Sequence, residues 1–154
     1  MAPAPETWPQ LGGRLVSGGH VLPVRIYFED TDFSGFVYHA SYLRFMERGR
    51  SDFIRCLGIS HQELDAGLHG ERLSFAVRKM TIDFMKPARI DDVVEVHTHP
   101  LPEKGVRLEL RQSIKRGAEV LVEAAVTIVV VTAHGRPRRL PATIRDRLDK
   151  AGNS

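Results

Sequence analysis

The stretch from Tyr27 to Arg50 holds the side chains best suited to chemistry, namely Asp30, Asp32 and His39. The two acids follow an apolar run that ends at Phe28, and a helical pattern begins after them. A carboxylate in such a loop lies close to the free N–H groups of the helix's first turn, which favour developing negative charge. This order pairs an acid or base with an anion-stabilising site.

The helix after this loop is predicted from apolar residues that recur every three or four positions from about Ala40. We expect it to run from His39 or Ala40 to Leu57, with Gly58 as its left-handed cap. Gly49 interrupts the apolar stripe, where glycine costs roughly 1 kcal/mol relative to alanine. We therefore expect Gly49 to face inward, where the helix backbone approaches the sheet closely.

Alternating apolar residues predict five β-strands, at about 21–28, 75–84, 91–99, 106–114 and 120–131. The parity changes between Val77 and Met80, which predicts a β-bulge around Arg78 or Lys79. Short links favour antiparallel neighbours, and the apolar character of both faces of the fifth strand predicts that it is central. We expect an α+β domain in which one curved five-stranded antiparallel sheet wraps one long helix.

Smaller elements are expected at three places. Residues 1–20 are rich in proline and glycine and are predicted to be a flexible leader to a single domain at 21–150. A capping-box pattern predicts a short helix from Ser60 through Ala66. Leu140, Ile144 and Leu148 predict a helical turn near the C-terminus.

Composition limits the function classes. With 154 residues and 42% apolar content the chain is long enough for one core. It contains no apolar run long enough for a membrane span, no signal-peptide pattern and only one cysteine, Cys56, so we expect a cytoplasmic protein. The net charge of +3 suits an anionic ligand. The basic residues near the C-terminus lack interleaved aromatic side chains, so nucleic acid is not an expected partner.

Several segments together resemble a known family. They are 29–32 (EDTD), 35–42 (GFVYHASY), 47–48 (ER), 75–81 (FAVRKMT) and 87–92 (PARIDD). In this order they resemble the YbgC-type acyl-CoA thioesterases of the 4-hydroxybenzoyl-CoA thioesterase-like hotdog superfamily, often associated with the bacterial Tol-Pal envelope system. The resemblance covers about Val24 to Pro141 and implies a hotdog fold.

The resemblance also implies a mechanism without a metal or redox cofactor. The family's catalytic aspartate falls on Asp32, as general base or nucleophile toward an acyl-CoA thioester. The His39 N–H would polarise the carbonyl, and its ring would position water or the carbonyl. The residues expected to bind substrate are Gly35, Val37, Tyr38, Glu47, Arg78 and Lys79, the last two near the phosphates of coenzyme A. Some relatives have a tyrosine where this chain has Phe28, which receives no chemical role.

The sequence is compatible with several alternatives. Asp32 could cap the helix or pair with Arg25, and Asp30 is more simply a turn former. The chain could instead be a hotdog dehydratase or hydratase, or a non-catalytic binder of acyl thioesters or acyl carrier protein in an envelope-associated complex. By resemblance we expect a homodimer or homotetramer with the active site at the subunit interface.

Overall fold

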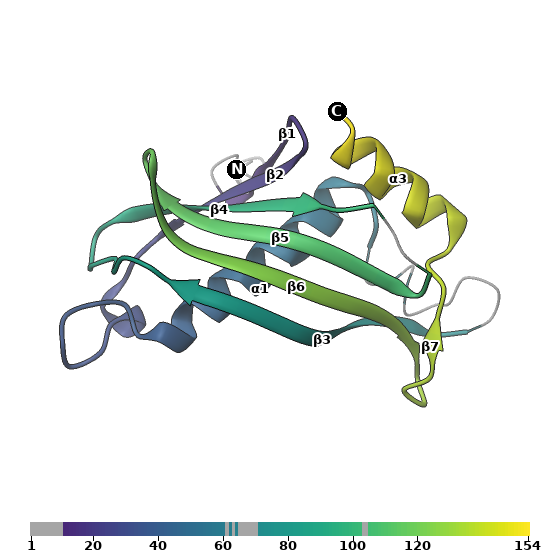
Figure 1. The fold of residues 1–154 in the computed structure, drawn as a ribbon, viewed down its shortest axis with the longest axis horizontal. Helices are drawn as coiled ribbons and strands as arrows, with labels where there is room; N and C mark the ends of the chain where they lie inside the picture. The colour runs from purple at the N-terminus through teal and green to yellow at the C-terminus, as the bar shows by residue number, and fades with distance from the viewer. Residues whose placement is uncertain (1–10, 61, 63, 65–70, 103–104) are drawn as a thin grey trace, which may run out of the picture.

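One long helix, α1 (His39–Cys56), lies against one face of a seven-stranded sheet that curves across it, as Figure 1 shows. The computed structural model describes residues 11–60, 62, 64, 71–102 and 105–154. The strands are β1 (Arg14–Val16), β2 (Gly19–Arg25), β3 (Leu73–Phe84), β4 (Val93–Pro100), β5 (Arg107–Arg116), β6 (Glu119–Thr132) and β7 (Pro137–Arg138). A 3₁₀ turn, η2 (Phe28–Asp30), precedes α1, and α3 (Ala142–Gly152) ends the chain.

The sheet is antiparallel throughout, in the order β1-β2-β4-β5-β6-β3, with β7 added beside β6. The α+β hotdog prediction is confirmed, with β1 and β7 as two short strands beyond the expected five. The prediction that the fifth strand is central was wrong. It is β6, next to the edge strand β3, and Glu123 and Ala125 on its outer face are exposed.

Helix α1 buries the stripe that its sequence predicts, including Tyr42, Phe45, Met46 and Phe53. It ends in a Schellman motif, in which the Gly58 N–H donates to Arg55 O at 2.9 Å and the Ile59 N–H donates to Ile54 O at 3.2 Å. Gly58 has a φ of +77°, as expected of the left-handed cap.

Gly49 faces the sheet, which confirms the prediction made from its place in the stripe. A Cβ there would lie 2.7 Å from Val96 Cγ1 and 3.4 Å from both Gln112 Nε2 and Thr98 Oγ1. The helix backbone therefore approaches β4 and β5 more closely at Gly49 than a larger residue would allow without a shift.

Strand β3 carries the expected bulge, because its register against β6 shifts between Val77 and Lys79. Its other edge pairs with no described strand, so it closes one side of the sheet. The side chains of Val77 and Phe84 on this strand are each 47% exposed. A long edge with exposed apolar side chains is a surface that proteins normally cover.

The start of the chain is more ordered than predicted. Part of the expected leader forms β1 and the first residues of β2, where Arg14–Val16 pairs with Gly19–Val21. The glycines permit this tight hairpin, since Gly18 has a φ of +80°. Residues 1–10 of the leader, and most of the short helix expected from Ser60 to Ala66, lie outside the described residues.

Helix α3 confirms the helical pattern predicted near the C-terminus, and its Ile144 and Leu148 side chains join the core. Within the described ranges, no helix has both the length and the hydropathy that crossing a bilayer requires.

Candidate active site

The predicted acidic loop is a tight hairpin placed just before α1. The Asp32 N–H donates to Phe36 O, and the Gly35 N–H donates to Asp32 O, both at 3.0 Å. Gly35 has a φ of +84°, which closes a type I turn with a following left-handed residue. A bridge between Thr31 and Val37 completes the hairpin. The loop is therefore held in one shape that presents Asp32 outward.

Asp32 is exposed, and Ser34 fixes its carboxylate. Asp32 Oδ1 accepts the Ser34 hydroxyl at 2.5 Å and the Ser34 N–H at 2.8 Å. These two bonds, together with the positive potential of His39, hold the pKa of Asp32 below its usual value. The group is therefore ionised near neutral pH.

The two structural alternatives for Asp32 do not apply. The Arg25 guanidinium donates to Asp91 O at 3.3 Å, and no described cation forms an ion pair with Asp32. Helix α1 begins after Tyr38 with no side-chain cap among the described residues. The carboxylate of Asp32 is thus available to a ligand.

The first turn of α1 offers free donors beside this hairpin. The Tyr38 N–H donates to Asp30 O at 2.9 Å, and the Ser41 N–H donates to Tyr38 O at 2.8 Å. No residue in the described part of the chain accepts from the N–H groups of His39 or Ala40. Such groups at a helix start can stabilise an oxyanion.

Asp30 has the turn-forming role that its position predicts. Its carboxylate accepts the Tyr27 N–H at 2.8 Å, and the residue is only 9% exposed. With its backbone oxygen bonded to Tyr38, Asp30 ties η2 to the start of α1. It supports the loop and does not face a ligand.

The predicted substrate-binding residues fall into two groups. Gly35, Val37 and Tyr38 lie in the loop with Asp32 and His39, although Val37 is buried and its N–H donates to Ala88 O at 2.9 Å. Tyr38 is half exposed and packs edge-on against the His39 ring.

The second group lies away from this loop. Glu47 is exposed on α1, eight residues after His39, or about 12 Å along the helix axis. Arg78 and Lys79 are exposed at the bulge of β3. A single copy of the chain therefore does not bring all the predicted residues into one site.

A cavity of about 440 Å³ lies beside Glu47, between the second half of α1, the first half of β3, β5, β6 and α3. Its walls are mainly apolar, but Arg50 also lines it, and the Arg50 guanidinium donates to Gln112 Oε1 at 2.9 Å. The sequence reading missed this pair. The available signal was Gln112, a polar residue on the otherwise apolar face of β5 that carries Leu108, Leu110 and Ile114.

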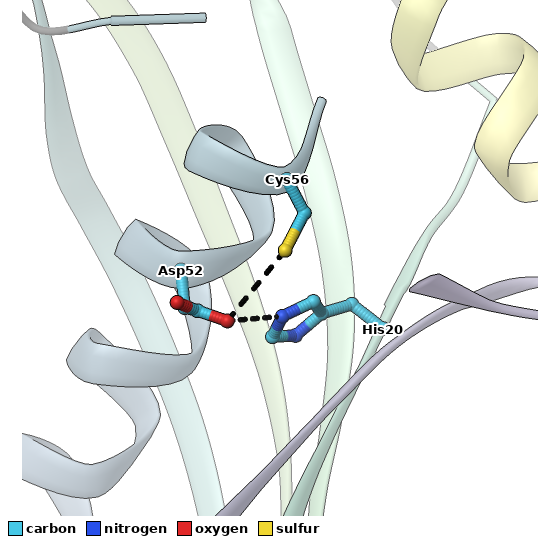
Figure 2. A group of neighbouring side chains, drawn as sticks. All are labelled: His20, Asp52 and Cys56. Atoms are coloured by element: carbon cyan, nitrogen blue, oxygen red, sulfur yellow. Dashed lines mark hydrogen bonds and ion pairs between the residues drawn. The ribbon is translucent and has the colours of Figure 1, made fainter. Parts of the chain in front are cut away.

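A second polar cluster, also missed, joins the start of the chain to α1. Figure 2 shows His20 and Cys56 pointing toward the carboxylate of Asp52. Asp52 Oδ2 accepts His20 Nε2–H at 2.7 Å and the Gly13 N–H at 2.8 Å, while Oδ1 accepts the Arg55 guanidinium at 2.8 Å.

This cluster has a structural role, because its hydrogen bonds join the start of the chain to α1. Both oxygens of Asp52 are already bonded, and Arg55 adds a positive charge that would repel a metal ion. Burial, and then the charge of Asp52, raise the pKa of the Cys56 thiol, so the reactive thiolate is disfavoured. The nearby His20 Nε2 is already bonded to Asp52 Oδ2, so it is not free to act as the base for Cys56.

Comparison with known proteins identifies the family of this chain. Residues 34–123 match the family model of the Thioesterase superfamily. The acyl-CoA thioester hydrolase YbgC of Escherichia coli O6:H1 is 42% identical over 79% of this chain and 90% of its own length. The acyl-CoA thioesterase YbgC of Haemophilus influenzae is 37% identical over 76% of this chain and 84% of its own.

A solved structure shows the same similarity. A probable thioesterase from Bartonella henselae superposes with a TM-score of 0.77 at 46% identity, covering 80% of this chain and 99% of that one. The family resemblance seen in the sequence motifs is therefore confirmed.

Proposed function

Because the chain belongs to the Thioesterase superfamily and is an acyl-CoA thioester hydrolase, we propose that Asp32 and His39 carry out the hydrolysis. The observation that supports this assignment most directly is an exposed, ionised carboxylate beside unbonded N–H groups at a helix start. These are the two components that attack on a thioester requires: a base or nucleophile, and donors for the oxyanion.

In the proposed reaction the thioester oxygen lies against the His39 N–H. Asp32 either removes a proton from the attacking water or attacks the carbonyl carbon itself. The tetrahedral intermediate then expels the thiolate of coenzyme A, which takes up a proton. If water was the nucleophile, this step yields the free acid directly. If Asp32 was the nucleophile, it leaves an anhydride between Asp32 and the acyl group, which a water molecule then hydrolyses to the free acid and the Asp32 carboxylate. A thiolate leaves readily, so neither a metal ion nor a longer chain of proton carriers is needed.

The experiment compares thiol release by the native chain and by Asp32→Asn on a panel of acyl-CoAs. We expect kcat to fall by about 10²–10⁴-fold, because the amide cannot act as base or nucleophile. Asp146→Asn, an exposed acid on α3, is the matched control and should keep native activity. Addition of EDTA should leave the native rate unchanged.

Equal activity of Asp32→Asn and the native chain would contradict the assignment of Asp32. The same panel includes acyl carrier protein thioesters and 2-enoyl-CoA. Binding of a carrier protein without thiol release would favour the non-catalytic alternative. Hydration of the enoyl group without thiol release would favour the hydratase.

We further propose that the active unit contains two copies paired along β3. The unpaired edge of this 12-residue strand and its exposed Val77 and Phe84 side chains support this arrangement. Two-fold pairing along the whole strand places Leu73 of one copy opposite the partner's Phe84. Because Phe84 packs against the His39 ring, the catalytic loop of one copy would come near the cavity of the other.

A further inference from the structure

The cavity that Arg50 lines is large enough for a small ligand, and its wall is mainly apolar with a few polar side chains. Phe53, Phe75, Leu110, Ile128 and Leu148 contribute to its apolar wall. Its volume of about 440 Å³ falls within the range typical of ligand pockets, which combine apolar walls with a few placed polar groups. Arg50 is the one cation among the described residues that line it.

A buried amide fixes the position of Arg50. Gln112 is 2% exposed, and its Nε2 donates to Met46 O at 3.0 Å and to Thr98 Oγ1 at 2.9 Å. These bonds direct its other end, Oε1, toward the guanidinium, which can only donate. Thr98 is fully buried as well, so this network has little freedom to rearrange.

The close approach at Gly49 makes the network possible. A Cβ at this position would come within 3.4 Å of both the Gln112 amide nitrogen and the Thr98 hydroxyl. The absent side chain lets the amide reach the helix backbone one turn before Arg50. The stripe-breaking glycine thereby serves the cavity as well as the packing of α1 on the sheet.

The Arg50 guanidinium has more hydrogen-bond donors than it has acceptors among the described residues. It carries five N–H groups, and Gln112 Oε1 is its one hydrogen-bond acceptor among the residues that the structure describes. Within the same residues, no carboxylate lies within ion-pair distance of it. Burial lowers the pKa of Arg50, and the charge of Glu47 only partly offsets this effect. An acceptor oxygen in the cavity would bond to donors that the described residues leave unpaired.

We propose that the cavity holds the acyl group of the substrate and that Arg50 selects acyl groups bearing an acceptor oxygen, such as a hydroxyl or carboxylate, over plain alkyl chains. This proposal rests on the thioesterase function proposed above. Arg50 lies eleven residues after His39, or about 16 Å along α1, so the acyl group enters from the catalytic loop of the partner copy. Gln112 is then a positioning residue that acts through Arg50.

The test uses pairs of acyl-CoAs of equal chain length that differ only in a terminal methyl, hydroxyl or carboxylate group. The readout is the ratio of kcat/KM for the oxygenated substrate to that for the alkyl one. Loss of active protein changes both values equally and cancels in this ratio. We expect this ratio to be about 10 to 100 for the native chain, which is the factor that a hydrogen bond to a charged group typically contributes.

Arg50→Met, which keeps an unbranched side chain without donors, should bring the ratio close to one. Gln112→Leu should lower it partly, and Arg50→Lys should restore part of the preference for the carboxylate. Arg44→Met is the matched control, because Arg44 is exposed on the same helix but does not line the cavity. Its ratio should equal that of the native chain.

An unchanged ratio in Arg50→Met would overturn the proposal. An equal loss on every substrate would do the same, because it would place Arg50 on the coenzyme A portion or in folding alone. If the native chain releases no thiol, the proposed hydrolysis fails separately. The selectivity is then measured by calorimetry as the affinity ratio of the same substrate pairs, with equal affinities counting against it.

Discussion

Asp30 and Asp32 are two residues apart, yet their carboxylates lie in different surroundings. Asp30 is turned inward onto the Tyr27 N–H, whereas Asp32 points outward, and within the described ranges Ser34 alone bonds to its carboxylate. Charge and spacing alone cannot distinguish two acids in one loop, because hydrogen bonds to the folded backbone decide their roles. The family motif was needed to select Asp32 from the sequence.

The polar residues of the interior were missed for a different physical reason. Gln112, Thr98 and His20 each occupy a position on the face of a strand that packs against α1. The period of the apolar residues identifies the buried face of a strand, and a single polar residue on that face does not change this pattern. Their partners come from distant parts of the chain, so only the fold reveals that each one is bonded.

The His20–Asp52 pair leads to a prediction about stability and pH. Burial lowers the pKa of His20, and the hydrogen bond to Asp52 offsets only part of this effect. His20 therefore binds a proton more readily in the unfolded chain than in the folded one. Its contribution to the free energy of unfolding is fully present above about pH 6.5 and is lost as the pH drops below this value. Asp52 acts in the same direction at lower pH. Burial alone would raise its pKa, but bonds from Arg55, His20 and Gly13 lower it overall.

The measurement is the free energy of unfolding in urea from about pH 8 to about pH 5. In His20→Gln the decline should be shallower by up to about 1.4 kcal/mol per pH unit, since one titrating group is lost. His134→Gln, at an exposed histidine, should keep the native slope. Parallel slopes for His20→Gln and the native chain would show that His20 does not titrate with folding.

At the scale of elements, local signals located α1 within a residue at each end. The apolar stripe, the acidic loop before it and Gly58 after it act over a few residues and are visible in the sequence. The bulge of β3 was equally local, as a change of parity. The order of strands was harder to predict. The apolar outer positions of β6 are partly small residues such as Ala125, which an exposed surface accommodates.

The end of α1 offers a direct test of this local control. Gly58→Ala places a Cβ on a residue with a φ of +77°, which costs an L-residue about 1–2 kcal/mol. We expect chemical unfolding to show a loss of that size, with little effect on kcat, because Gly58 lies at the opposite end of α1 from His39. Arg44→Ala, within the exposed face of the same helix, should change stability far less. Native stability in Gly58→Ala would mean that the Schellman motif adds nothing.

For the whole molecule, one copy of the chain separates the two groups that we propose for the reaction, the Asp32 loop and the cavity. The loop with Asp32, which we propose to be catalytic, lies at the first turn of α1, and the cavity with Arg50 lies beyond its middle. The edge of β3 runs between these two regions and is unpaired within the described chain. The association of two or more copies remains a prediction from the sequence, and so does the location in the cytoplasm. The structure of a single copy of the chain tests neither of them.

A mixing experiment tests whether the site is composite. Asp32→Asn removes the carboxylate, and Ile128→Trp fills part of the cavity, which has room for the larger ring. Each variant alone should be nearly inactive. If each site combines the loop of one copy with the cavity of the other, a mixed dimer contains one site with both defects and one intact site. Random exchange in an equal mixture makes about half of the dimers mixed, and each mixed dimer has one of its two sites intact. The mixture should then show about a quarter of native activity.

Sites built within a single chain would give no recovery at any mixing ratio, since every chain would carry one defect. Sedimentation of each variant and of the mixture provides the control, because all three should show the native oligomeric state. A stable, fully active monomer of the native chain would contradict the composite site directly. Recovery of activity in a mixture that sediments as the native oligomer would therefore place the acyl cavity and the catalytic carboxylate of each working site on different copies.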